Sequence, residues 1–103
     1  MNELNESGNK VGYWEECYSS VLISKGNFSD GKKIGYWEEY YNNGNLWYKG
    51  TYSESENRIG YWEECFSNGN LWSKGNYSES ENRIGYWEWC YFNGELNYKK
   101  YYI

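Results

Sequence analysis

The sequence predicts an all-β protein: a single-layer antiparallel β meander of four tandem hairpin repeats, with about eight strands. A motif of Val or Ile followed by Gly-Tyr-Trp-Glu occurs at residues 11, 34, 59 and 84. A second aromatic run follows each motif after a short turn sequence, as expected for a β-hairpin. The chain has 7 Trp and 14 Tyr but few aliphatic residues, so aromatic rings must supply its apolar surface.

The repeats divide the chain into one short segment and one domain. Residues 1–10 precede the first repeat, and we expect them to form a flexible N-terminal segment. The repeat domain covers residues 11–103, with units at about 11–33, 34–58, 59–83 and 84–103. The second halves at 46–52 and 71–77 match closely, whereas those at 22–28 and 96–102 are diverged. Diverged end units are typical of repeat arrays, because end units cap them.

The turns are marked by Asn-Gly, which occurs at 43–44, 68–69 and 93–94. Asn-Gly between two strand-like runs is a strong hairpin signal, because both residues tolerate positive φ. In the first unit we expect a three-residue loop, Ser19-Ser20-Val21, at this place. The polar segments 53–58 and 78–83 are expected to connect successive units.

A strand register follows from the Asn43-Gly44 turn. Pairing outward places Tyr41 opposite Leu46, Tyr40 opposite Trp47, Glu39 opposite Tyr48, Glu38 opposite Lys49 and Trp37 opposite Gly50. The first and third units give equivalent pairs, including Trp62 with Gly75, and this agreement supports the register. We expect each indole to pack over the glycine on the opposite strand.

The register separates two faces of the sheet. One face carries Trp37, Gly50, Tyr41, Leu46 and Tyr52, and we interpret it as structural. The other carries aromatic rings on both sides of the Glu38–Lys49 pair, and exposed aromatic residues in such number indicate a partner. The expected partner-binding residues on this second face are Tyr13, Tyr36, Trp47, Tyr61, Trp72 and Tyr86.

The second unit carries a known repeat pattern, in Gly35-Tyr-Trp37-Glu-Glu-Tyr-Tyr-Asn-Asn-Gly44-Asn-Leu46 followed by Lys49-Gly-Thr-Tyr52. This pattern resembles the MORN repeat (membrane occupation and recognition nexus), and it is most similar to the bacterial variant. The resemblance covers residues 11–102. It implies an elongated sheet of successive hairpins with a role in protein–protein contact or scaffolding, in some bacterial relatives as an antitoxin.

The composition argues against several classes of function. The chain has no His, and adjacent glutamates such as Glu38 and Glu39 point to opposite faces of a strand, so we expect no enzyme. Cys17, Cys65 and Cys90 occupy one repeat position, and equivalent positions of neighbouring hairpins are expected to lie about 9–10 Å apart, too far for disulfides. We therefore expect free thiols, no metal site and no cofactor.

The net charge of −5 disfavours nucleic acid and anionic lipid as ligands. The sequence shows no signal peptide and no apolar stretch long enough to span a membrane, so we expect a cytoplasmic protein.

These features predict a binding or scaffolding module, for example an antitoxin or inhibitor, whose aromatic and acidic face contacts a basic partner protein. Two alternatives remain open. One is a glycan- or choline-binding aromatic repeat, and the other is an acidic mimic of nucleic acid that inhibits a basic protein. A homodimer in which a second copy covers the structural face is also open.

Overall fold

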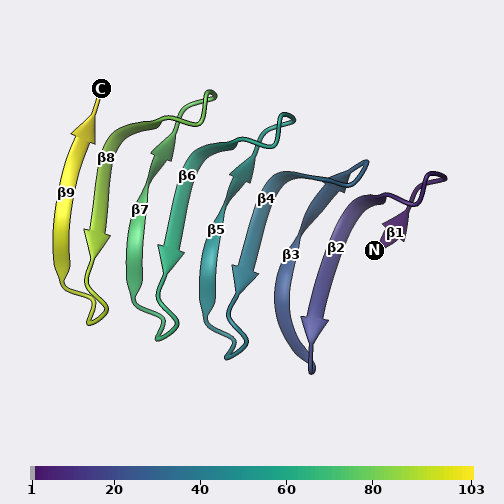
Figure 1. The fold of residues 1–103 in the computed structure, drawn as a ribbon, viewed down its shortest axis with the longest axis horizontal. Coiled ribbons are helices and arrows are strands. Elements are labelled where there is room, and N and C mark those ends of the chain that lie inside the picture. The colour runs from purple at the N-terminus through teal and green to yellow at the C-terminus, as the bar shows by residue number, and fades with distance from the viewer. Residues whose placement is uncertain (1) are drawn as a thin grey trace.

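The computed structural model describes residues 2–103, which form one open antiparallel sheet and contain no helix. Each strand lies beside its predecessor in the chain, which confirms the predicted single-layer meander (Figure 1). The sheet measures 47 × 34 × 13 Å. Its strands are β1 (Glu3–Leu4), β2 (Lys10–Tyr18), β3 (Val21–Ser29), β4 (Lys32–Tyr40), β5 (Leu46–Tyr52), β6 (Arg58–Cys65), β7 (Leu71–Tyr77), β8 (Arg83–Cys90) and β9 (Leu96–Tyr102).

The segment expected to be flexible carries the short strand β1, which adds a ninth strand to the eight predicted. Glu3 pairs with Val11, and Leu4 pairs with Lys10. The side chain of Asn2 extends this edge, because it donates to the carbonyl of Glu15 (3.0 Å) and accepts from the Glu15 amide (2.9 Å). The N-terminal segment therefore covers part of the β2 edge, which would otherwise present unpaired backbone groups.

The lengths of the hairpin turns differ from the prediction: the Asn-Gly turns are longer, and the turn of the first unit is shorter. The amide of Gly44 donates to the carbonyl of Tyr41 (2.9 Å), and only Gly44 of the Asn-Gly pair has a positive φ, of 91°. The turn is therefore a three-residue loop, 42–44, in which the Asn43 side chain accepts from the Asn45 amide (2.9 Å). In the first unit both Ser19 (φ 51°) and Ser20 (φ 66°) are left-handed, so that turn has two residues instead of the expected three.

A β-bulge follows each of these turns. Tyr40 pairs with Leu46, whereas Glu39 pairs with Tyr48, so Trp47 is an extra residue on β5. The predicted partners of Tyr40 and Tyr41 are therefore wrong. From Glu39 to Trp37 the predicted register is confirmed, because the bulge compensates for the longer loop.

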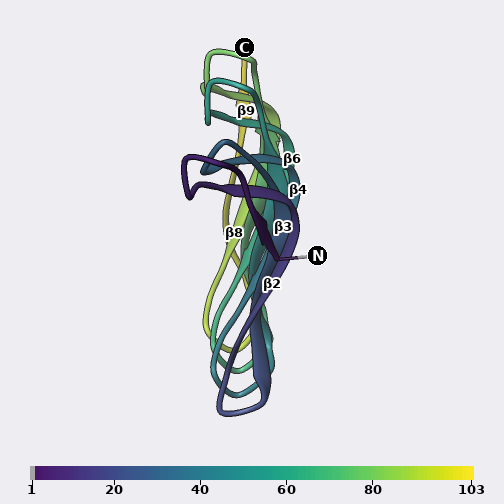
Figure 2. The same ribbon diagram turned by 90° about the vertical axis from the view of Figure 1, so that its right-hand side faces the viewer.

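A glycine kinks each strand that begins a unit. On β6, Gly60 has a φ of 67°, and the pairing with β5 jumps from Lys49–Glu63 to Thr51–Ile59. Gly35 and Gly85 have the same conformation. Figure 2 shows the sheet edge-on, with both ends of the strands curving toward one side.

The tryptophans of this motif are buried although the sheet has no second layer. Trp37, Trp62 and Trp87 expose only 1%, 4% and 2% of their surface. Each ring lies flat on the glycine of the preceding hairpin: a Cβ built on Gly50 would lie 2.0 Å from Cδ2 of Trp62. Gly75 has the same relation to Trp87, at 2.1 Å.

The predicted register pairs Trp37–Gly50 and Trp62–Gly75 are therefore confirmed, but the packing contact is different. The indole over each glycine comes from the following unit and not from the same hairpin. Each Trp thus ties its own unit to the one before it, which is how a single layer builds a continuous core.

Candidate functional site

The structure divides the predicted partner-binding residues between two faces. Tyr13, Tyr36, Tyr61 and Tyr86 lie on one face, which we name the tyrosine face. Trp47 and Trp72 were expected beside them but lie on the opposite face with Trp37, Trp62 and Trp87, which we name the tryptophan face. The ring centroid of Trp47 lies 5.0 Å from that of Tyr48, and Trp47 lines the same hollow as Trp62. The bulge explains the difference, because an extra residue re-aims the side chains beside it.

The bulge also moves Leu46. Leu46 pairs with Tyr40, so it lies on the tyrosine face and not on the structural face to which the sequence assigned it. Tyr41 stays on the tryptophan face, where its ring packs on Trp47 (5.7 Å between centroids). Its hydroxyl donates to the carbonyl of Cys65 at 2.6 Å.

The tyrosine face has one hydrogen bond that repeats in all four units. Each tyrosine hydroxyl donates to the carboxylate two residues ahead on its own strand: Tyr13 to Glu15 (2.8 Å), Tyr36 to Glu38 (2.7 Å), Tyr61 to Glu63 (2.5 Å) and Tyr86 to Glu88 (2.6 Å). These bonds hold the rings in one orientation. The bond to Glu88, together with partial desolvation, raises the pKa of Tyr86 to about 12.

Lysines on the alternate strands neutralise these glutamates. Lys49 is in register with Glu38 of its own hairpin and with Glu63 of the next. Its ammonium is paired with Glu63, at 3.5 Å, rather than with the Glu38 expected from the sequence. Corresponding pairs join Lys25 to Glu38 (3.2 Å) and Lys74 to Glu88 (3.4 Å). The rows of Glu and Lys therefore alternate in charge along the sheet.

The pKa of Glu38 is set by opposing effects of burial and of its neighbours. Burial raises the pKa of the Glu38 carboxyl, but hydrogen bonds from Tyr40 and Tyr36 and the nearby Lys25 lower it more. The net pKa of Glu38 lies below its ordinary value. Burial and the same hydrogen bond raise the pKa of Tyr40 to about 12.

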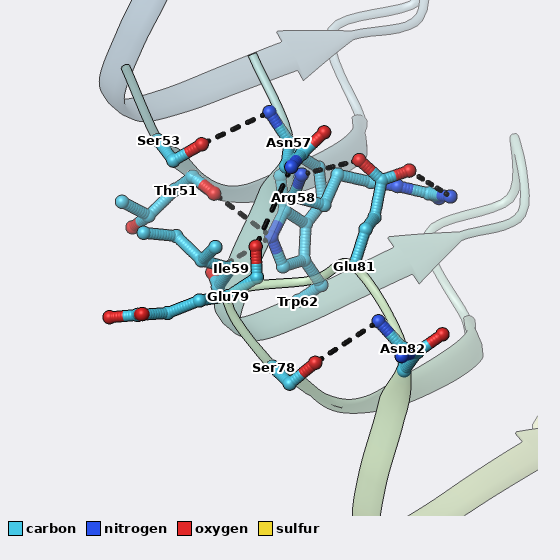
Figure 3. Close-up of polar contacts among 10 residues, drawn as sticks. All are labelled: Thr51, Ser53, Asn57, Arg58, Ile59, Trp62, Ser78, Glu79, Glu81 and Asn82. Carbon is cyan, nitrogen blue, oxygen red and sulfur yellow. Dashed lines mark hydrogen bonds and ion pairs between the residues drawn. The ribbon is translucent and has the colours of Figure 1, made fainter. Parts of the chain in front are cut away.

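The tryptophan face contains a hollow of about 370 Å³ between the second and third units. We name it the aromatic hollow; it is lined by Trp47, Tyr48, Tyr52, Glu56, Arg58, Trp62, Glu64 and Glu81. Tyr48 stacks on Trp62 (5.8 Å between centroids), and Tyr52 meets the same indole edge-on (5.1 Å). The indole N–H of Trp62 donates to the carbonyls of Thr51 (3.2 Å) and Ile59 (3.1 Å), which holds the ring in place (Figure 3).

In the hollow, Arg58 is bound by a carboxylate, whereas the carboxylate of Glu64 has no direct partner among residues 2–103. Figure 3 shows the Glu81 carboxylate accepting from the backbone amide of Arg58 (2.9 Å) and from its guanidinium (3.4 Å). The side-chain carboxylate of Glu64 makes no direct hydrogen bond or ion pair with the described residues. Burial raises the pKa of the Glu64 carboxyl, while Arg58 and Arg83 act in the opposite direction. The hollow is not evident from the sequence, because the bulge and the inter-unit loops create it.

The remaining candidate groups do not converge. Cys17 is exposed, Cys65 is half-buried and Cys90 is buried, and all three are free thiols. Among residues 2–103, no group of three or more His, Cys, Asp or Glu is arranged to hold a metal ion. The same residues include no helical segment that could cross a membrane.

Comparison of the chain with protein-family models, with curated proteins and with solved structures finds no match. The functional argument therefore rests on the two faces of the sheet.

Proposed function

We propose that this chain is a non-enzymatic, MORN-like repeat module that binds a basic partner protein through its tyrosine face. The observation that carries the proposal is the repeated row of tyrosines whose hydroxyls are held by glutamates of the same strands. Tyr36 and Tyr61 expose 50% and 46% of their surface, so these rings are both exposed and oriented. Rigid aromatic anchors with polar neighbours are typical of the centre of a protein interface.

The shape of the tyrosine face favours a protein over a small molecule. Equivalent rings recur every second strand, roughly 10 Å apart, along one single-layer sheet. A partner surface can contact several rings at this spacing, whereas a small ligand reaches one or two. Because Glu and Lys alternate on this face, the face does not present the uniform row of negative charge that a phosphate mimic requires.

The distribution of charge supports a basic partner. The strand glutamates of the tyrosine face have lysine neighbours, so they add little to the net charge of −5. The two loops between units, 53–57 and 78–82, carry Glu54, Glu56, Glu79 and Glu81. An acidic end of the sheet attracts a basic partner and speeds its association. Free thiols fit the cytoplasm, and an antitoxin or inhibitor is one form that such a module takes.

The test is capture of partners from the native host by the immobilised chain and by matched variants. We expect Tyr36→Ser with Tyr61→Ser to lose a protein that the unmodified chain retains. Tyr18→Ser is the control, because Tyr18 is 69% exposed but lies at a hairpin end. Circular dichroism should show an intact sheet in both variants. Retention of the same proteins by the double variant would exclude the tyrosine face as the binding surface.

A further inference from the structure

The tryptophan face contains a repeated arrangement in which an ammonium group lies in an aromatic box. In the first unit, the ammonium of Lys10 lies over the rings of Trp14 (4.8 Å) and Phe28 (5.1 Å) and contacts Glu16 at 2.6 Å. Aromatic faces attract cations, and the carboxylate adds a direct charge interaction. The first unit thus binds a cation supplied by its own chain.

The second unit repeats this arrangement. The ammonium of Lys33 lies over Trp37 (4.9 Å) and Tyr52 (5.9 Å) and pairs with Glu39 at 3.7 Å. In the fourth unit, the guanidinium of Arg83 occupies the corresponding place, over Trp87 (5.2 Å) and Trp89 (5.4 Å).

The third unit departs from the pattern. The cation directly before its motif, Arg58, lies over Tyr77 at 4.6 Å but not over the indole of Trp62. The carboxylate of Glu81 in the 78–82 loop holds both the amide and the guanidinium of Arg58. Arg58 therefore keeps its contact with Tyr77, the ring equivalent to Phe28 and Tyr52, but it lies neither over Trp62 nor in a salt bridge with Glu64. The aromatic hollow opens on Trp62 and Glu64 and is completed by rings of the second unit.

We propose that the aromatic hollow binds the ammonium group of a lysine side chain of the partner protein. This proposal rests on the proposed function and adds a second anchor point on the other face, beside the acidic loops. The equivalent Lys10 and Lys33 define the ligand chemistry, because they place an ammonium against the same motif tryptophan and the same carboxylate position.

The charges of the hollow are consistent with a cationic ligand. Three carboxylates line it, those of Glu56, Glu64 and Glu81, against the single guanidinium of Arg58. Arg58 is already paired with Glu81, which leaves the carboxylates of Glu56 and Glu64 without a salt bridge in the lining. The hollow is therefore acidic overall, although the charge of Arg83 also acts on Glu64. The side-chain carboxylate of Glu64 makes no direct hydrogen bond or ion pair within residues 2–103, and it occupies the position that Glu16 and Glu39 occupy against Lys10 and Lys33, so an incoming ammonium is expected to contact it.

The experiment is a titration of the chain with N-acetyl-lysine methylamide, followed through the indole N–H resonance of Trp62 by NMR. We expect saturable binding with a Kd on the order of millimolar, since one side chain supplies all the contacts. The matched probe with an acetylated lysine amine keeps the shape but loses the charge, and it should not bind. Equal binding of the two probes, or no saturable binding of the first, would overturn the proposal.

Two variants locate the site. Glu64→Gln should weaken binding of the lysine probe by about tenfold, because it removes the charged acceptor. Glu16→Gln is the control at the equivalent position of the first unit, where Lys10 already occupies the box away from the hollow, and it should leave the Kd unchanged. An unchanged Kd for Glu64→Gln, or equal losses in both variants, would refute the assignment.

These outcomes are separable from those of the proposed function. If the lysine probe fails but the tyrosine variants still abolish partner capture, the module binds through the tyrosine face alone. If the probe binds as expected and capture does not depend on the tyrosines, the hollow is a cation site and the tyrosine-face interface is wrong.

Discussion

Replacing Gly50 by alanine tests how the repeat units are tied together. A Cβ at this position would lie 2.0 Å from Cδ2 and 2.1 Å from Cε2 of Trp62. The indole would have to move by more than about 1 Å to reach an ordinary van der Waals distance. Trp62 is only 4% exposed and donates to two backbone carbonyls, so it cannot move without loss of packing and hydrogen bonds.

The magnitude follows from these contacts. Overpacking of this kind costs about 1–3 kcal/mol, and weakening the indole hydrogen bonds adds about 1 kcal/mol. Removing a glycine from a strand returns about 0.5–1 kcal/mol. We therefore expect Gly50→Ala to lower the free energy of unfolding by about 2–3 kcal/mol, measured by urea denaturation, and to lower Tm by about 10–20 °C.

A double-mutant cycle identifies the ring responsible. In a Trp62→Ala background, Gly50→Ala should become neutral or slightly stabilising, because the obstacle is gone. In a Trp37→Ala background the full cost should remain, although Trp37 is the register partner of Gly50 within its hairpin. A cost that persists without Trp62, or disappears without Trp37, would refute packing between units.

Gly60→Ala is the matched control for glycine replacement. A Cβ on Gly60 would meet no atom within 4 Å, but the residue has a φ of 67°. Its cost of about 1–2 kcal/mol comes from the left-handed backbone and should not depend on Trp62.

Three further predictions concern a loop, the alkaline pH range and the thiols. Glu56→Gly should raise the free energy of unfolding by about 0.5–1 kcal/mol, because Glu56 holds a φ of 63° that disfavours a side chain; no increase in urea denaturation would contradict this strain. The pKa of Tyr40 is raised to about 12 in the fold, so the stability it contributes is fully present below its unfolded pKa of about 10 and is lost as pH rises toward 12. Denaturation curves at pH 9 to 12 should show this loss, and Glu38→Gln should reduce it, since Glu38 is one cause of the shift. In the folded protein the exposed Cys17 should react with a thiol reagent before the buried Cys90, and both should react without prior reduction after denaturation; equal native rates would be inconsistent with the packing of Cys90.

The sequence by itself determined the meander and much of its register. The recurring Gly-Tyr-Trp-Glu motif and the alternation of aromatic residues are local patterns, so they specify the strands without knowledge of their neighbours. The pairs Trp37–Gly50, Glu38–Lys49 and Glu39–Tyr48 follow from these patterns and are confirmed. The tyrosines of the tyrosine face share one face for the same reason, because side chains alternate strictly along a regular strand.

Only the tertiary structure decided which face carries Trp47 and which indole covers each glycine. Trp47 changes face because a three-residue loop and a bulge occur together, and their effects on the register cancel beyond Glu39. The indole over Gly50 comes from the next unit, because a strand in the sheet has neighbours on both sides and the hairpin pattern describes only one of them. The aromatic hollow also depends on contacts between units: the loop glutamate Glu81 binds Arg58, 23 positions before it in the chain, and Arg58 lies over Tyr77 rather than over Trp62. Periodicity describes each strand and its turn, whereas the faces and the hollow depend on how successive units pack.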